Sequence, residues 1–303
     1  MKPTKKYQNL NPEFWANIKL LNQRLGYTVR KTKSNPQGGF KIPTVEDVET
    51  VFSKEGLNET KLIKNGSFSK FGNLIVDYMK YRGDILTNSV EPNLMDKDQA
   101  EKLFKKVYKS YTPTCPLPTN KQKGDKKGYA YLTCLVNMLI EKEIGKRDCN
   151  YDPKELTALT ENNFPIRTLS RRVDGAYPAV IDPIAIWEIK EYYYTTTFGS
   201  RVADGVYETQ LDGWELWEAE LNANKKVYHY LIADAHYTWW TMGRSYLCRI
   251  IDSLHMGLID EVLFGKEVID RIPVLARSWI KKKEESEIQN NIAIAAEPKT
   301  EYK

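Results

Sequence analysis

The first 110 residues carry apolar side chains at helical spacing, separated by polar loops. Asn11 followed by Pro12 is a typical helix start, because Asn caps free N–H groups and Pro fits the first helical position. At Thr44 a Thr-x-x-Asp pattern gives a second capping signal. Apolar residues recurring every three or four positions predict helices over residues 14–25, 44–54, 71–81 and 96–108. We therefore expect a helical N-terminal region.

Further along the chain, the pattern changes to an alternation of helices and strands. It predicts helices over residues 129–144 and 152–161, strands over 168–174, 179–181 and 184–194, a helix over 202–221, a strand over 226–233 and a helix over 242–258. The helix at 152–161 is inferred from its Asp152-Pro153 start. Taken in order, these elements predict an α/β fold in which helices flank a mixed central sheet.

Shifts in composition divide the chain. The expected parts are a helical, basic region over residues 1–112, a proline- and lysine-rich loop or linker over 113–127, an α/β core over 128–278, and a C-terminal helix with a flexible tail over 279–303. Residues 1–150 hold 27 Lys and Arg against 16 Asp and Glu, whereas residues 151–303 hold 18 against 24. A basic half suits contact with a polyanion, although the same charges also suit an ordinary solvated surface.

The sequence gives no sign of a membrane segment. No apolar stretch follows the basic residues near Met1, and the most apolar segment, residues 128–140, is short and contains Thr133 and Asn137. Four cysteines lack Cys-x-x-Cys spacing, which favours reduced thiols over a zinc site or a disulfide framework. We expect a cytoplasmic protein that does not contact a membrane.

The strongest β segment, residues 184–194, also carries the candidate chemistry. Side chains alternate between the faces of a strand, so Glu188 and Lys190 share one face while Trp187 and Ile189 share the other. The same Glu-x-Lys spacing occurs in polar parts of the chain, where it has no special meaning. At the end of an apolar strand, the two charges are either a solvated surface pair or part of a site.

A second carboxylate precedes this strand by one short hairpin. Asp174 stands before Gly175, and a turn between the two segments can bring its side chain to Glu188. Asp182 is a competing acid, but five residues between it and Glu188 are too few for an intervening strand and turn. The spacing therefore favours Asp174 as the partner of Glu188.

Together, Asp174, Glu188 and Lys190 resemble the signature of the PD-(D/E)xK nuclease superfamily, and most of all its type II restriction endonucleases. The resemblance covers residues 155–234 and implies a restriction-endonuclease-like core with the order α-β-β-β-α-β. It also implies that Asp174, Glu188 and the backbone carbonyl of Ile189 bind Mg²⁺, which prefers oxygen ligands. Lys190 would orient and help to deprotonate the attacking water and stabilise charge on the scissile phosphate.

The function implied by this resemblance is sequence-specific hydrolysis of double-stranded DNA. Water would attack the phosphodiester in a Mg²⁺-dependent step that leaves 5′-phosphate ends, and a homodimer would cut both strands. One alternative is a nuclease of the same fold that acts in repair, recombination or phage DNA processing. Another is a non-catalytic nucleic-acid-binding protein in which the charged groups are structural.

Further residues are candidates for supporting roles. The possible supporting groups are Glu155, Glu161 and Gln210, and the possible DNA contacts are Arg30, Lys31, Lys33, Ser200 and Arg201. The first three of these contacts lie in a loop that could equally be plain surface, and Ser200 could simply cap the next helix. Tyr207, Trp214 and Trp217 recur at helical spacing, which favours core positions over a base-stacking platform. For His236, a structural role is favoured over a site role.

Overall fold

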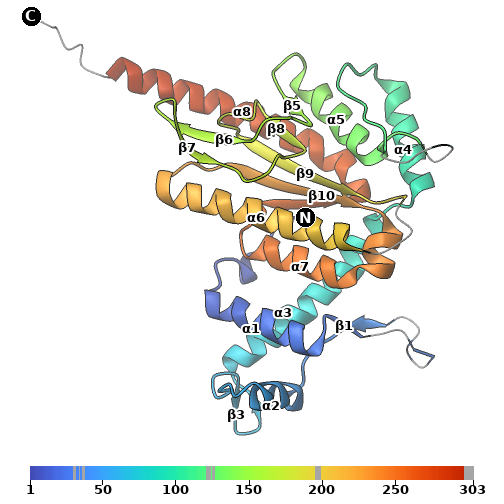
Figure 1. Ribbon diagram of the computed structural model, residues 1–303, viewed down its shortest axis with the longest axis vertical. Helices are drawn as coiled ribbons and strands as arrows, with labels where there is room; N and C mark the ends of the chain where they lie inside the picture. Colours follow the sequence, from blue (N-terminus) through green and yellow to red (C-terminus); the bar gives the residue numbers. More distant parts are fainter. Residues whose placement is uncertain are drawn as a thin grey trace, which may run out of the picture.

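The computed structural model describes residues 1–29, 32–33, 35, 38–120, 124, 127–194 and 199–296, with side chains up to residue 288. Within these residues, five strands form a mixed sheet in the order β11-β10-β9-β8-β5 (Figure 1). The strands are β5 (Asn150–Tyr151), β8 (Gly175–Tyr177), β9 (Ala185–Glu191), β10 (Tyr228–Asp234) and β11 (Glu261–Phe264). β5, β8 and β9 pair antiparallel, whereas β9, β10 and β11 run parallel. The predicted α/β class with a mixed sheet is confirmed.

Helices cover both faces of this sheet (Figure 1). On one face lie α5 (Tyr131–Ile144) and α8 (Val268–Ala296), and on the other lie α6 (Ser200–Ala223) and α7 (Arg244–His255). α6 connects β9 to β10 and α7 connects β10 to β11, which is the crossover that parallel neighbours require. Two separate apolar cores fill the two interfaces.

The alternation predicted for β9 is confirmed. Trp187 and Ile189 pack into the core shared with α5 and α8, while Glu188 and Lys190 turn toward α6. The indole of Trp187 stacks on Trp279 of α8 with ring centroids 5.4 Å apart. Gly175 on β8 makes this possible, because a Cβ at that position would lie 2.1 Å from the Trp187 ring. The face that carries the candidate chemistry is therefore fixed by aromatic packing on the opposite face.

The N-terminal part is helical, as predicted. It contains α1 (Pro12–Leu25), α2 (Val45–Lys54) and α3 (Lys70–Ile85), with the short hairpins β1 (Thr28–Val29) with β2 (Gly39–Phe40) and β3 (Ile63–Lys64) with β4 (Ser67–Phe68). Asn11 and Thr44 cap α1 and α2 as their sequences indicate. In contrast, α4 (Lys97–Ser110) packs against α5 of the α/β part. Short 3₁₀ or π turns cover Lys5–Tyr7, Leu86–Val90, Glu91–Asn93, Tyr237–Met242 and Gly265–Glu267.

The helix predicted for residues 152–161 is wrong. Asp152 has a positive φ of 49° and does not open a helix, and the chain instead forms the hairpin of β6 (Ala158–Glu161) and β7 (Phe164–Thr168). Its turn, Asn162 and Asn163, has φ values of 51° and 61°. Two consecutive positive φ angles at Asn residues suit a tight hairpin turn, whose twist matches that of the flanking strands. The turn chemistry therefore outweighs the Asp-Pro signal.

The neighbouring strand assignments also differ from prediction. Of residues 168–174 only Thr168 lies in a strand, and the strand beside β9 is β8, which begins at Gly175. Residues 179–181 belong to no strand of the main sheet and touch β6 through a single bridge between Ala158 and Ile181. Two residues of β5 and four of β11 are too few to show a clear pattern in the sequence.

The C-terminal helix begins earlier than predicted. α8 starts at Val268 and runs through residue 279, where the sequence suggested a boundary. Its first half carries apolar side chains into the core, including Ile272 and Trp279. Residues 297–303 lie outside the described part of the chain. Across the described residues, the helices are too short or too polar to be membrane-spanning segments.

Candidate active site

Asp174 is held against β9 by its backbone and by its side chain. Its N–H donates to the carbonyl of Trp187 at 3.1 Å, and its carbonyl accepts from the N–H of Asp152 at 2.9 Å. Carboxylate oxygen Oδ2 accepts the N–H of Ile189 at 2.7 Å. Burial and the nearby charge of Glu188 raise the pKa of Asp174 to about 6. The structure thus brings the two predicted carboxylates together.

Glu188 is completely buried and lies between two cations. Its Oε2 is 2.9 Å from Nζ of Lys190, and its Oε1 is 2.9 Å from Nη1 of Arg171. Burial acts to raise the pKa of Glu188, but the two cations outweigh it and hold the pKa below its ordinary value. For Lys190, burial favours the neutral amine, yet Glu188 and Asp174 raise its pKa above the usual range. Both groups are therefore ionised at neutral pH.

Three members of this network were not found from the sequence. Arg171 precedes β8, and Glu208 and Asp212 lie one turn apart on α6. Arg171 donates to Asp212 at 2.6 Å and to Glu208 at 3.3 Å, and Lys190 donates to Glu208 at 2.9 Å. The four-residue spacing of the two acids on one helix was a usable signal, because it places them on one face. No sequence pattern links either acid to Arg171.

Asp212 carries one unsatisfied oxygen in this network. Its Oδ1 is buried and has no hydrogen-bond partner among the described residues. Burial and the charge of Glu188 raise the pKa of Asp212 to about 7, although Arg171 acts in the opposite direction. Close approach of α6 to β9 creates this environment. It depends on Gly205, where a Cβ would lie 2.8 Å from the Tyr192 hydroxyl and 3.2 Å from Cδ of Lys190.

A cleft of about 420 Å³ opens beside this network, and Glu188, Arg171 and Asp212 lie behind its wall rather than in its lining. Asp174, Lys190 and Glu208 line it, and so does the predicted phosphate contact Arg201 at the start of α6. Glu191 also lines the cleft and accepts the backbone N–H of Thr133 near the N-terminus of α5. The cleft therefore joins acidic oxygens, a buried lysine and an exposed arginine.

The other predicted site residues lie apart from this cleft or do not contribute as expected. Glu155 and Glu161 are exposed, the first on a bend and the second beside the hairpin turn of β6, so neither comes from an upstream helix. Gln210 donates to the hydroxyl of Ser253 on α7 at 2.8 Å and joins two helices. Ser200 is the first residue of α6 but not its cap, which is Gly199. Lys33 is exposed, and Arg30 and Lys31 lie outside the described residues.

Asp182, the competing acid, faces a different neighbourhood. It accepts the N–H of Thr160 at 2.8 Å and pairs with Lys225 at 3.1 Å. Burial acts to raise the pKa of Asp182, but these donors lower it overall. Because Asp174 contacts β9 beside Glu188 and Asp182 contacts β6, the geometry favours Asp174.

The outer face of α6 is exposed, contrary to prediction. Tyr207, Trp214 and Trp217 are 51%, 45% and 50% exposed, so the expectation of core positions is wrong. Leu211 and Leu221 are exposed on the same helix. We call these five residues the α6 stripe. A contiguous set of large apolar side chains on a surface helix is unusual for an isolated protein surface.

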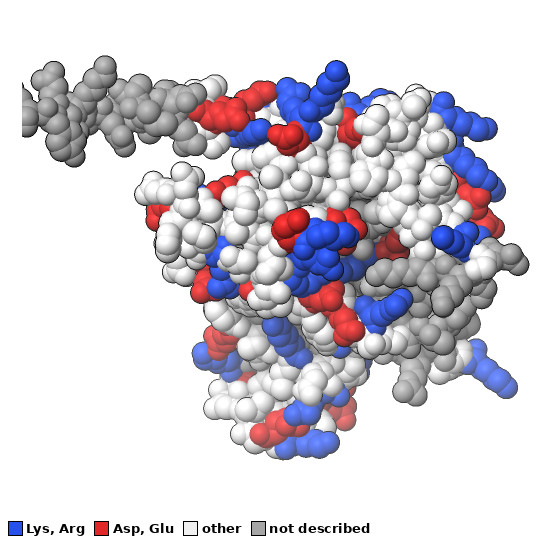
Figure 2. Space-filling model, turned by 45° about the horizontal axis from the view of Figure 1, so that its top comes forward, with Lys and Arg blue, Asp and Glu red and all other residues white. Residues whose placement is uncertain are grey.

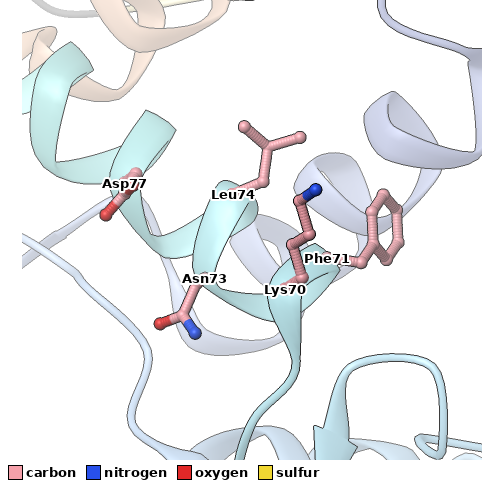
Figure 3. A pocket seen from close by; sticks show the side chains of 5 residues that line it. All are labelled: Lys70, Phe71, Asn73, Leu74 and Asp77. Atoms are coloured by element: carbon pink, nitrogen blue, oxygen red, sulfur yellow. The ribbon is translucent and has the colours of Figure 1, made fainter.

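A larger hollow of about 740 Å³ lies on α3, away from the cleft. Its lining residues come from successive turns of this one helix, as Figure 3 shows, with Lys70 and Phe71 at one end and Asp77 at the other. It contains no grouping of acid, base and nucleophile beyond single charged side chains at its rim. The smaller cleft beside β9 is therefore the better candidate site.

Surface charges are mixed rather than segregated. On the face drawn in Figure 2, acidic and basic side chains lie next to one another and form no continuous basic surface. In the N-terminal part, several lysines and arginines pair with acids, such as Arg24 with Glu55 and Lys41 with Asp47. The lysine excess of residues 1–150 therefore does not by itself define a nucleic-acid surface.

The donor set beside β9 fits a magnesium ion held by few protein ligands. Within the described part of the chain, no group of three or more His, Cys, Asp or Glu side chains is placed to hold a metal. Asp174 and Glu188 supply two carboxylates, and the Ile189 backbone adds a carbonyl. Mg²⁺ commonly binds through one or two carboxylates and keeps several waters. Burial and, after it, the charge of Glu188 raise the pKa of Asp174, and a divalent cation would offset both by stabilising the carboxylate form.

Fold and site define an α/β protein whose central strand carries a buried network of carboxylates and cations beside an open cleft. The chain belongs to the family described as "Domain of unknown function (DUF7687)", whose family profile matches residues 95–279. A second profile, "Domain of unknown function (DUF7690)", matches residues 1–89. The junction between the two lies just before α4. No curated protein and no solved structure matches the chain.

Proposed function

We propose that this protein is a Mg²⁺-dependent endonuclease that hydrolyses double-stranded DNA, of type II restriction character. The observation that carries the proposal is the position of Asp174, whose carboxylate binds the backbone N–H of Ile189 between Glu188 and Lys190. Asp174 and Lys190 line one cleft, and Glu188 is buried directly behind it, 2.9 Å from Nζ of Lys190. Arg201 at the same cleft supplies a cation for a phosphate of the DNA backbone.

The order of the elements supports the same proposal. The series α5, β5, β8, β9, α6 and β10 follows the order α-β-β-β-α-β, with the β6–β7 hairpin inserted after β5. The first three of these strands are antiparallel and the last is parallel to β9. We infer that this part of the chain is a restriction-endonuclease-like core.

In this proposal, Asp174, Glu188 and the Ile189 carbonyl hold the metal. A bound Mg²⁺ lowers the pKa of its water and neutralises negative charge that develops on the phosphate. Lys190 contributes its positive charge to the scissile phosphate and orients the water by donating a hydrogen bond. Its raised pKa makes it a poor proton acceptor, so an electrostatic role is favoured over the general-base role that the sequence suggested.

Arg171 must release Glu188 before that carboxylate can bind a metal. The guanidinium also pairs with Asp212 and Glu208 on α6, so it keeps two acidic partners after it leaves Glu188. Lys190 likewise keeps Glu208. Arg171 and Lys190 therefore keep carboxylate partners on α6 if Glu188 binds a metal ion, so no buried cation is left unpaired.

The α6 stripe supports the homodimer that cleavage of both strands requires. α6 carries Glu208 into the cleft on one side and exposes Tyr207, Trp214 and Trp217 on the other. Pairing of two copies through this helix would cover the stripe and bring two clefts to neighbouring positions. Such pairing is self-complementary, as a two-fold interface requires. Light scattering of the wild type should give twice the monomer mass, and Trp214→Glu should give the monomer.

A plasmid assay tests the proposed activity. Wild-type protein with Mg²⁺ should convert supercoiled DNA to discrete linear fragments, and EDTA should prevent this. Glu188→Gln and Lys190→Met should lose about 100- to 1,000-fold in rate, the size expected when a group that stabilises the transition state is removed. Asp182→Asn is the matched control, because this acid lies outside the cleft. Nicking or smearing instead of fragments would favour a nuclease with another role.

A non-catalytic nucleic-acid-binding protein is the second candidate, and one observation favours it. Both oxygens of Glu188 already lie beside cations, as they would in a network whose role is structural. Under this alternative the wild type binds DNA but cleaves none of a panel of plasmids at any Mg²⁺ concentration. Cleavage by Glu188→Gln at the wild-type rate would refute the assigned site, although not nuclease activity itself.

A further inference from the structure

A second pocket of about 390 Å³ adjoins the cleft, and Tyr192 lines both. The residues that line it follow the carboxyl ends of β9 and β10 and stand at the start of α4. Tyr192 and Tyr193 come from the segment after β9, and His236 and Tyr237 from the segment after β10. In sheets with parallel strands, ligands bind at this end, where the connecting segments diverge.

The backbone that forms this pocket is held in an unusual conformation. Ala235 has φ at 119° and is almost fully buried, although such angles are unfavourable for residues other than glycine. Asp234 fixes it by accepting the N–H groups of Met95 and Ala235 at 2.7 and 2.8 Å and the Tyr193 hydroxyl at 2.5 Å. A π-helix over Tyr237–Met242 follows at once. Strained backbone and π-turns both cluster at functional sites.

The lining of the pocket combines aromatic rings with groups that match a nucleotide. Tyr192, Tyr193 and Tyr237 supply ring surfaces, and the ring of Tyr237 is 54% exposed. Asp96 supplies a carboxylate that can accept a hydrogen bond from the amino group of a base, and the nearby Lys97 supplies a cation for a phosphate. Stacking on aromatic side chains with cations beside them is how proteins hold unpaired bases.

We propose that this pocket binds one unpaired base of the DNA strand that enters the cleft. The inference rests on the proposed nuclease function and specifies its substrate, because the backbone would pass over Tyr192 from Lys190 into the pocket. A base stacked inside a duplex cannot reach such a pocket, so the nucleotide must be extruded from the helix or be unpaired beforehand. DNA with an unpaired base near the scissile phosphate is then bound more tightly than fully paired DNA.

Fluorescence anisotropy in EDTA tests the inference without cleavage. The probes are a fluorescein-labelled 20-base-pair duplex, the same duplex with one bulged adenine, and the single strand. Wild-type protein should bind the bulged duplex and the single strand more tightly than the paired duplex. Tyr237→Ala should remove this preference, with a loss of about 5- to 100-fold on the bulged DNA, as expected for one lost stacking contact. Tyr237→Phe should retain it.

Tyr108→Ala is the matched control, because Tyr108 on α4 is similarly exposed, at 46%, and lies outside the pocket. Equal affinity of the wild type for all three probes, or an unchanged preference in Tyr237→Ala, would overturn the inference, and so would the absence of DNA binding. The plasmid assay of nuclease activity does not depend on this pocket. If Tyr237→Ala cleaves bulged DNA in the presence of Mg²⁺ as well as the wild type does, the pocket proposal alone is refuted. If the preference for bulged DNA depends on Tyr237 but the wild type cleaves no DNA, the nuclease proposal alone is refuted.

Discussion

Two buried ion-pair networks in this protein differ in balance and in access to solvent. The first joins α3 to α7: Arg82 donates twice to Asp252 at 2.9 Å, Asn22 accepts from the same guanidinium, and Tyr78 donates to Asp252. One cation meets one anion, and both are buried. The second network joins β9 to α6 and, among the described residues, places Arg171 and Lys190 among the carboxylates of Asp174, Glu188, Glu208 and Asp212.

The comparison distinguishes an ion pair that holds two helices together from a network in which, in our proposal, Arg171 releases Glu188 to a metal ion. The balanced pair is enclosed in the interior, with Arg82 fully buried and Asp252 5% exposed. The unbalanced network holds more acids than bases, has two carboxyl groups with pKa values raised to about 6 and about 7, and borders a cleft. Perturbed pKa values beside a cleft are typical of functional sites.

Breaking the balanced network should have the largest effect on stability. In Arg82→Ala, Asp252 would remain buried with Tyr78 but without its cation, and we expect the free energy of unfolding to fall by about 3–5 kcal/mol. Urea unfolding followed by tryptophan fluorescence measures this change. Replacing both partners, as in Arg82→Met with Asp252→Leu, should recover much of the loss. A loss below about 1 kcal/mol in the single variant would remove the contrast between the two networks.

The next largest effect is expected from a cation added to the unbalanced network. Mg²⁺ at about 100 times its Kd should stabilise the folded protein by about 2.7 kcal/mol, because it binds only the folded state. Thermal unfolding with Mg²⁺ and with EDTA measures the difference. Asp174→Asn should lose this gain and Asp182→Asn should keep it. Equal gains in both variants would place the ion elsewhere.

An effect of similar size should appear in the pH dependence of stability. The pKa of Asp174 is raised to about 6 in the folded protein, against about 3.9 in an unfolded chain. The folded state binds the extra proton, so this stabilising contribution is complete below about pH 4 and is lost as pH rises through about 6. Between these values, Asp174→Asn should flatten the fall in stability, which is on the order of 3 kcal/mol because one pKa unit is worth about 1.4 kcal/mol. In this variant, Asp212, whose pKa is raised to about 7, should still make the free energy of unfolding fall as pH rises through about 7.

The smallest change in stability is expected for Glu188→Gln. Lys190 keeps Glu208, and Arg171 keeps Asp212 and Glu208, so neither cation is left alone. We expect the free energy of unfolding to fall by less than the about 3–5 kcal/mol that breaking a buried pair costs when a charge is left alone, because both cations here keep a carboxylate. The same urea titration provides the measurement. A loss of the size expected for Arg82→Ala would make Glu188 part of a structural network and would argue against a site.

Local signals in the sequence were sufficient for some elements and not for others. The capping residues Asn11 and Thr44 and the alternation along β9 depend on near neighbours, and each was predicted correctly. The β6–β7 hairpin was not predicted, because Asp152-Pro153 suggests a helix start; the local signal of the hairpin lies at its turn, Asn162-Asn163, where both residues have positive φ. β11 follows no pattern of its own and forms because β10 offers a parallel edge.

The same dependence on near neighbours in the sequence explains why only part of the candidate site could be predicted. Asp174, Glu188 and Lys190 lie within 17 residues of one another, so strand alternation and one turn suffice to relate them. Arg171, Glu208 and Asp212 meet only because α6 crosses β9 closely, and that approach depends on the absence of a side chain at Gly205. Likewise, the α6 stripe is exposed because no described element packs over that face of α6, and helical spacing alone does not show which face is covered.

The three hydrogen bonds that hold Asp174 have one further consequence. They anchor the residue on both sides, to Asp152 and to the β9 backbone at Trp187 and Ile189, so the sheet rather than a loop sets the direction of its carboxylate. An acid oriented in this way is preorganised, and the entropy of ordering it is lost when the chain folds rather than when a ligand arrives. Whatever cation this carboxylate meets, it therefore meets a ligand that is already in place.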